Sequence, residues 1–136
     1  MFEKKLKLQV GNAKNEGQII FSIDPKILNE QGKEAYKIEI GNSVKVTANN
    51  TLGLYWATRT LLQVLEQSHS LPKGEITDFP DYPKRGFMLD VGRKFFPLEY
   101  LEDVAKLMSY YKMNTFQVHL NDNGFIQHFG NDWSKT

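Results

Sequence analysis

The sequence predicts an α+β arrangement, an antiparallel sheet with a packed helix, followed by an α/β strand–helix–strand unit. In the first half, polar and apolar residues alternate as in half-buried strands, and a stretch with helical spacing follows. The second half contains a continuous apolar run, which is typical of a strand buried on both faces of a parallel sheet. Between them, residues 66–84 are polar and carry several prolines. We interpret this segment as a connection or domain boundary.

The alternation predicts strands over residues 5–10, 18–23, 35–40 and 43–48. The last two flank Gly41-Asn42, so we expect a hairpin with a two-residue turn, in which both residues tolerate positive φ. In the third strand, Tyr36, Ile38 and Ile40 share one face, and we expect that face to be buried.

A helix is expected after these strands. Asn49, Asn50 and Thr51 each offer a side-chain oxygen that can cap its first backbone N–H groups. The apolar residues that follow recur at helical spacing, and they are Leu54, Ala57, Leu61 and Leu65, widened by Tyr55, Trp56 and Leu62. This stripe predicts core packing against the preceding sheet.

The second half begins with an apolar strand over residues 86–91. Pro97 then opens a helix, where its missing N–H has no partner to lose. We expect Leu101, Ala105 and Met108 on the inner face of this helix. Another strand over residues 115–120 follows, and residues 121–124 turn away from it. This order of elements predicts a parallel strand pair.

Composition excludes several classes of function. The net charge is +1 and the charged residues are interleaved, so we expect neither a nucleic-acid partner nor a membrane partner. The absence of cysteine excludes disulfides and thiolate chemistry. The chain starts with charged residues rather than with a signal peptide, and it has no apolar run long enough to span a bilayer. No cofactor is predicted.

Two segments carry a family pattern. Residues 81–97 contain Arg85-Gly86, Asp90 and Arg93-Lys94-Phe95-Phe96-Pro97, and residues 112–122 contain Lys112, Asn114, His119 and Asp122. They resemble the first two barrel strands of family-20 glycoside hydrolases, the β-N-acetylhexosaminidases. The helix at residues 52–63 resembles that of the family's accessory domain. The sequence departs from the family pattern at Lys94, which replaces a histidine, at Asn123, which replaces an aspartate, and at Gly124-Phe125.

The resemblance implies that residues 1–78 are the accessory α+β domain and that residues 79–136 are the N-terminal fragment of a catalytic (β/α)8 TIM barrel. It implies a parent enzyme that removes terminal β-linked N-acetylglucosamine or N-acetylgalactosamine from glycans or glycoconjugates by substrate-assisted, retaining hydrolysis. The catalytic Asp-Glu pair of that mechanism lies beyond residue 136, so we expect this chain alone to be inactive. The substrate class implies a periplasmic or secreted parent protein.

The resemblance also assigns site residues. Arg93 matches the arginine that binds the sugar hydroxyls, and Asp122 matches an aspartate of the active-site hydrogen-bond network. In a barrel, the ends of neighbouring parallel strands meet at the same rim, so both side chains are expected there. Asp90 and His119 are expected to support them. Arg85, at the opposite end of its strand, is expected to make a structural ion pair.

Other interpretations of these residues stay open. Arg93 and Asp122 alone also fit a surface ion pair, and His119 also fits a hydrogen-bonded core residue. His119, Asp122 and His128 lack a recognised metal-ligand spacing, so no metal site is predicted.

A different class of function stays open as well. The departures from the family pattern also fit a non-catalytic carbohydrate-binding or interaction module on the same scaffold. Finally, two barrel strands without neighbours expose apolar faces and open edges. We therefore expect the barrel stub to self-associate or to pack against the first domain.

Overall fold

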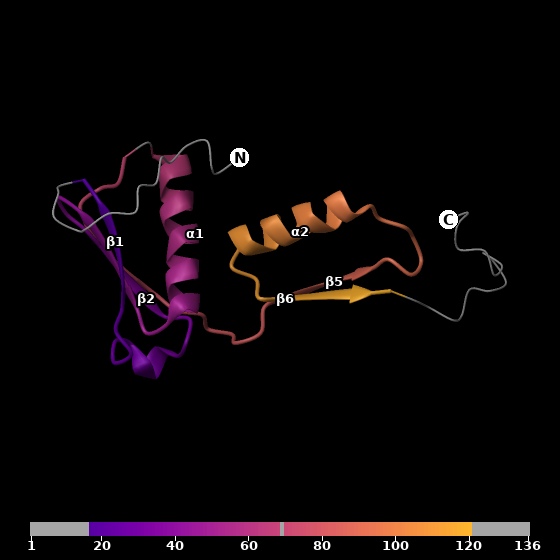
Figure 1. The fold of residues 1–136 in the computed structure, drawn as a ribbon, viewed down its shortest axis with the longest axis horizontal. Helices are drawn as coiled ribbons and strands as arrows, with labels where there is room; N and C mark the ends of the chain where they lie inside the picture. The colour runs from indigo at the N-terminus through magenta and orange to yellow at the C-terminus, as the bar shows by residue number, and fades with distance from the viewer. Residues whose placement is uncertain (1–16, 69, 121–136) are drawn as a thin grey trace. The chain divides into compact units, whose positions relative to one another are not determined.

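The computed structural model describes residues 17–68 and 70–120. The chain divides into two compact units, Met1–Phe79 and Pro80–Thr136. The first contains a four-stranded sheet and a long helix, and the second contains a two-stranded sheet and a shorter helix (Figure 1).

In the first unit, the described strands are β1 (Ile19–Ile23), β2 (Tyr36–Ile40), β3 (Val44–Ala48) and β4 (Gly74–Asp78). They form one sheet in the order β1-β3-β2-β4. β1 runs parallel to β3, whereas β2 is antiparallel to both of its neighbours. A short 3-10 helix, Asn29–Gln31, lies between β1 and β2. The strands expected near residues 18–23, 35–40 and 43–48 are confirmed, while the strand expected at 5–10 lies outside the described residues.

The turn between β2 and β3 differs from the prediction. Ile40 pairs with Val44, so three residues connect the strands instead of two. The Gly41 N–H donates to the carbonyl of Ser43 at 3.0 Å. The described residues with positive φ are found elsewhere, at Gly17, Leu28, Gly32 and Lys112. The extra residue closes the turn without the left-handed conformation that a two-residue turn requires.

β4 corrects the interpretation of residues 66–84 as a connection throughout. Gly74–Asp78 pairs along its whole length with β2, for example Ile38 with Ile76. The segment is short, mostly exposed, and has one large apolar side chain, Ile76, which packs against the core. An edge strand of this kind forms because β2 offers unpaired backbone groups. The periodicity of the segment itself does not indicate that such a partner exists.

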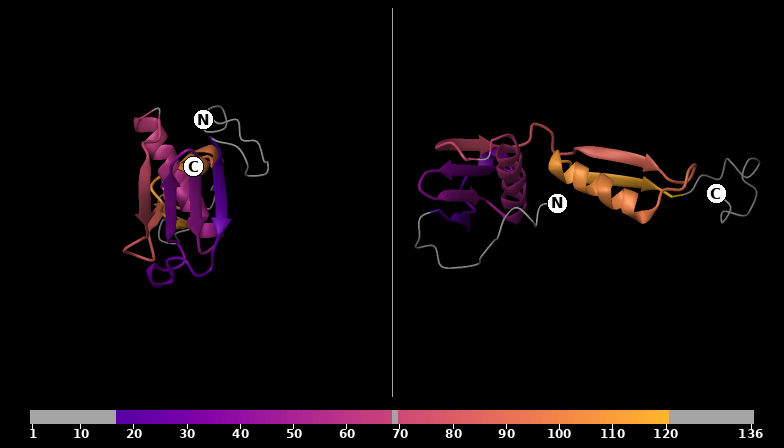
Figure 2. Two further views of the ribbon diagram at one scale, coloured as in Figure 1. Left: turned by 90° about the vertical axis from the view of Figure 1, so that its left-hand side faces the viewer. Right: turned by 90° about the horizontal axis from the view of Figure 1, so that it is seen from above.

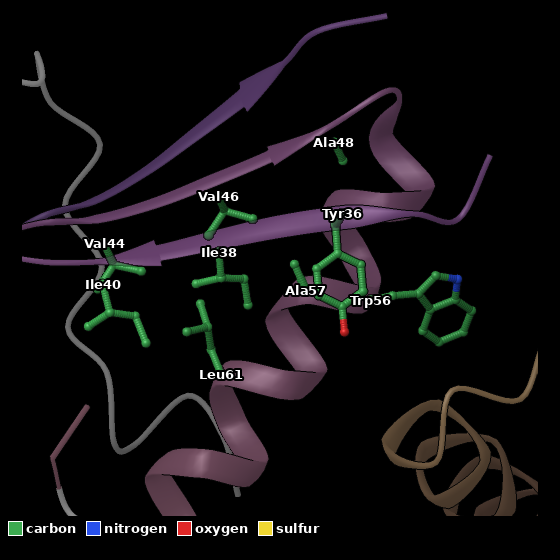
Figure 3. Close-up of a cluster of buried hydrophobic side chains, with 9 residues drawn as sticks. All are labelled: Tyr36, Ile38, Ile40, Val44, Val46, Ala48, Trp56, Ala57 and Leu61. Carbon is green, nitrogen blue, oxygen red and sulfur yellow. The ribbon is translucent and has the colours of Figure 1, made fainter. Parts of the chain in front are cut away.

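The helix α1 (Thr51–Gln67) covers one face of the sheet. Asn50 is its N-cap, and its side chain accepts hydrogen bonds from the backbone N–H groups of Leu52 (2.8 Å) and Gly53 (3.3 Å). Alternate side chains of β2 and β3 point toward the helix (Figure 3). The buried core consists of Tyr36, Ile38, Ile40, Val44, Val46, Ala48, Trp56, Ala57 and Leu61. The predicted inner face of the sheet and the core role of the helix are confirmed, except that Tyr55, which was expected to widen the apolar stripe, is 41% exposed.

Tyr36 carries a polar group into this core. Its hydroxyl donates to a carboxylate oxygen of Asp78 in β4 and lies 2.5 Å from the hydroxyl of Thr60 in α1. The side chain is 1% exposed. The pKa of Tyr36 is raised well above its usual value, mainly because the side chain is buried and also because of the hydrogen bond to Asp78. A neutral tyrosine therefore joins β2, β4 and α1 at one point.

In the second unit, β5 (Gly86–Asp90) pairs in parallel with β6 (Thr115–His119), and α2 (Leu98–Tyr110) connects them. The helix runs alongside the strand pair (Figure 2). The helix begins at Leu98, one residue later than expected, so Pro97 is its N-cap rather than its first residue. Met108 is buried and Leu101 is half-buried as predicted, but Ala105 is exposed and Val104 is half-buried in its place.

The burial expected on both faces of β5 is not found. Phe87 is 44% exposed and Met88 is 54% exposed. Among the described residues, β5 has β6 on one edge and α2 along the pair, so part of its apolar surface has no protein neighbour. Within residues 17–68 and 70–120, neither helix has both the length and the apolar character that crossing a membrane requires.

Candidate functional site

The carboxyl end of β5 holds Asp90 and Arg93 together. Asp90 is the last residue of the strand, and its Oδ2 lies 3.1 Å from Nε of Arg93. Its Oδ1 accepts hydrogen bonds from the backbone N–H groups of Gly92 (3.0 Å) and Arg93 (3.2 Å). One carboxylate thus fixes both the turn after the strand and the side chain that the turn presents.

The exposure of the two partners differs. The Asp90 side chain is 26% exposed, whereas the Arg93 side chain is 61% exposed. A carboxylate on the Nε edge of a guanidinium restricts the plane of that group, and guanidinium N–H groups in general suit adjacent hydroxyls of one solute.

His119 lies opposite Asp90 across the parallel pair. Its carbonyl accepts hydrogen bonds from the backbone N–H groups of Val91 and Gly92, both at 3.0 Å, so the turn that carries Arg93 is tied to the end of β6. His119 is exposed in the strand pair, and its role as a core or supporting residue stays a prediction. Asp122 lies outside the described residues, as does His128.

Aromatic side chains follow Arg93. The rings of Phe96 and Tyr100 stack with their centroids 4.9 Å apart, and Nζ of Lys94 lies 5.9 Å from the Phe96 centroid. Lys94, which stands where the family pattern has histidine, therefore lies over the ring of Phe96, which in turn stacks on Tyr100 of α2. These contacts join the segment after Arg93 to the first turn of the helix.

The amino end of the same strands carries a second polar cluster. The Arg85 N–H donates to Oδ1 of Asn114 at 2.9 Å, and the Asn114 N–H donates to the carbonyl of Arg85 at 2.8 Å. The Arg85 guanidinium donates to the carbonyls of Tyr82 (2.7 Å) and Lys112 (2.8 Å). These two contacts are with backbone carbonyls, and the ion pair expected for Arg85 stays a prediction.

Asn114 was not predicted as a site residue, although it stands in the second family segment. A signal for it was present. An asparagine directly before a strand and after a helix end is a residue type that bonds local backbone groups. Across the described ranges, histidine, aspartate and glutamate form no group of three or more that could hold a metal ion.

The comparisons with known proteins bear on both units. Residues 1–79 match glycosyl hydrolase family 20, domain 2, and residues 82–127 match glycosyl hydrolase family 20, catalytic domain. Curated relatives include a beta-hexosaminidase of Akkermansia muciniphila, 34% identical over 95 residues, and one of Porphyromonas gingivalis, 30% identical over 128 residues. These alignments cover 66% and 86% of this chain but 19% and 16% of the relatives, so the chain spans less than a fifth of their length.

Solved structures give the same result. A GH20 exo beta-N-acetylglucosaminidase from Vibrio harveyi in complex with N-acetylglucosamine is 34% identical, with a TM-score of 0.66 over 77% of this chain and 17% of that one. A Streptomyces plicatus beta-hexosaminidase is 30% identical, with a TM-score of 0.67 over 82% of this chain and 24% of that one. The family resemblance seen in the sequence is confirmed. On the matches to both of its units, the chain belongs to glycosyl hydrolase family 20.

Proposed function

We propose that this chain is part of a β-N-acetylhexosaminidase. Residues 1–78 would form the accessory domain, and residues 79–136 would form the first strand–helix–strand of a (β/α)8 barrel. The parallel pair β5–β6 with its connecting helix is the unit from which such barrels are built. The family matches over both units support this assignment of the two domains.

Arg93 carries the substrate-binding part of the proposal. It projects, 61% exposed, just beyond the carboxyl end of β5, which is the end where barrel enzymes bind substrates. The substrate would be a glycan with a terminal β-linked N-acetylglucosamine or N-acetylgalactosamine, and Arg93 would donate to two of its ring hydroxyls. Asp90 would hold the guanidinium plane, while Asp122 and His119 would complete the hydrogen-bond network from the next strand.

The proposed mechanism divides the chemistry between substrate and enzyme. The oxygen of the substrate's 2-acetamido group attacks the anomeric carbon as the glycosidic bond breaks, forming an oxazolinium ion. A glutamate protonates the leaving oxygen, and the neighbouring aspartate orients the acetamido group. Water then opens the oxazolinium ring, and the anomeric configuration is retained. That Asp-Glu pair belongs to a later barrel strand, so residues 1–136 alone would hydrolyse nothing.

The test is hydrolysis of an aryl β-N-acetylglucosaminide by the protein made from the complete reading frame. Arg93→Ala should lower kcat/KM about a hundredfold or more, because it removes two hydrogen bonds from a charged donor, each worth about 1.5–3 kcal/mol. Arg59→Ala is the matched control. That arginine lies in α1 with its guanidinium 4.9 Å from the Tyr55 ring centroid, and its loss should leave kcat/KM unchanged.

The departures at Lys94 and Asn123 favour a second candidate, a carbohydrate-binding module on the same scaffold without hydrolysis. A complete, folded protein that binds N-acetylglucosamine through Arg93 but turns over no aryl glycoside would support this module and overturn the enzyme proposal.

We also propose that residues 1–136 self-associate through the exposed apolar residues of the second unit, among them Phe87, Met88 and Leu107. A light-scattering measurement that shows residues 1–136 to be strictly monomeric would contradict this proposal.

A further inference from the structure

The register of β5 against β6 is not specified by hydrophobic alternation. Phe87, Met88 and Leu89 are consecutive apolar residues, so both faces of β5 are apolar. A slip of one residue would exchange the two faces of a strand. In β5 the exchange would place apolar side chains where apolar side chains already stand, so little free energy opposes it. Another feature must therefore fix the register.

That feature is a closed ring of hydrogen bonds between Arg85 and Asn114, just before the two strands. The Arg85 N–H donates to the Asn114 side chain at 2.9 Å, and the Asn114 N–H donates to the Arg85 carbonyl at 2.8 Å. The same carbonyl also accepts from the Thr115 N–H at 3.3 Å. Because the ring uses one side-chain oxygen and the backbone groups of two particular residues, it closes in only one register.

The ring is itself held by the surrounding backbone. The Arg85 guanidinium donates to the carbonyls of Tyr82 and Lys112, and the Asn114 side-chain N–H donates to the carbonyl of Pro83 at 2.9 Å. Lys112, two residues after the end of α2, has a left-handed φ of 56°, and its carbonyl accepts the Arg85 hydrogen bond. The chain entering β5 and the turn entering β6 therefore meet at these two side chains.

We propose that Arg85 and Asn114 are positioning residues that set the register of β5 on β6 and thereby the place of Arg93. In this register Asp90 lies opposite His119, whose carbonyl receives the N–H groups of Val91 and Gly92. A slip at the amino end of the pair would break that junction at the carboxyl end and turn Arg93 away. The consequence for catalysis rests on the proposed function, whereas the register itself does not.

Engineered disulfides read the register directly, since the chain contains no cysteine. Met88 and Gln117 are register partners on one face, so Met88→Cys with Gln117→Cys should oxidise readily in residues 1–136. Met88→Cys with Val118→Cys reports a one-residue slip, because in the present register these side chains point to opposite faces. Adding Asn114→Leu should reduce the yield of the Met88–Gln117 cross-link about tenfold or more, because the ring of hydrogen bonds is lost.

The controls separate register from general damage. Asn114→Asp keeps the acceptor for the Arg85 N–H and should retain the first cross-link. Asn42→Leu, at an exposed asparagine of the β2–β3 turn, should also retain it. If Asn114→Leu proves unfolded by circular dichroism, Arg85→Gln replaces it, since that change removes the guanidinium bonds and leaves the backbone groups of residue 85 in place. An unchanged Met88–Gln117 cross-link in the folded variant would overturn the proposal.

The two proposals fail separately. If the cross-link shifts but the complete protein hydrolyses no aryl glycoside, the positioning pair stands and the proposed enzyme activity falls. If the complete protein is active and Asn114→Leu changes neither the cross-link nor kcat/KM, the positioning pair falls and the enzyme stands.

Discussion

Gly53 offers a sharp test of how α1 packs on its sheet. A methyl group added at this position would lie 2.6 Å from the carbonyl oxygen of Ala35 and 2.8 Å from Cβ of Ala48. Ordinary contacts begin near 3.4 Å, and the nearer atom belongs to the backbone, so rotation of a side chain cannot relieve the overlap. The substitution Gly53→Ala must therefore push the helix away from β3 by several tenths of an ångström.

The expected change in stability follows from two opposing effects. In an exposed helix, Gly→Ala stabilises by about 1 kcal/mol, because it lowers the entropy of the unfolded chain. Here overpacking acts against that gain, with a penalty of typically about 1–3 kcal/mol. Retreat of the helix also loosens Trp56, Ala57 and Leu61, which are buried against the sheet. We expect a net loss of about 1–2 kcal/mol in the free energy of unfolding.

Urea unfolding followed by far-UV circular dichroism measures this loss as a lower midpoint at unchanged slope. Gly74→Ala is the matched control, because an added methyl group at Gly74 meets nothing within 4 Å. It should change stability by no more than about 0.5 kcal/mol. If Gly53→Ala were as stable as the unmodified chain or more stable, the close approach of α1 to the sheet would be refuted.

Two further predictions concern the same unit. The raised pKa of Tyr36 means that its stabilising contribution is complete below the unfolded value near pH 10 and is lost as the pH rises above it, by about 1.4 kcal/mol per pH unit. Alkaline unfolding should therefore be less steep in Tyr36→Phe, and equal slopes in the two proteins would contradict the buried phenol. Asn50→Ala removes the N-cap of α1 and should destabilise by about 1 kcal/mol, whereas Asn42→Ala in the exposed turn should not. Urea midpoints of the two variants give that comparison.

Asp90 shows how one residue of the second unit holds a backbone turn and a neighbouring side chain together. Its Oδ1 holds the turn after β5, and its Oδ2 holds the guanidinium of Arg93. At the other end of the strand, Arg85 and Asn114 hold the backbone of two chain segments. The family segment over residues 81–97 thus contains residues with distinct tasks, and the hydrogen-bond partners distinguish them where the sequence pattern does not.

The elements that can be predicted from the sequence are those whose signal lies within a few neighbouring residues. Alternation in β2 and β3 defines a buried face, and helical spacing with Asn50 before it defines α1, because side-chain direction repeats with the period of the backbone. The family pattern likewise pointed to Arg93 and Asp90 at one strand end, since three positions along the chain keep them close.

Features whose partners lie far along the chain can be seen only once the chain has folded. β4 exists because the edge of β2 supplies its hydrogen bonds, and Gly53 is confined by the backbone of Ala35. The ring between Arg85 and Asn114 joins residues separated by a whole strand and helix. Periodicity describes which way a side chain faces, whereas pairing, close approach and register depend on the group that folding brings opposite to it.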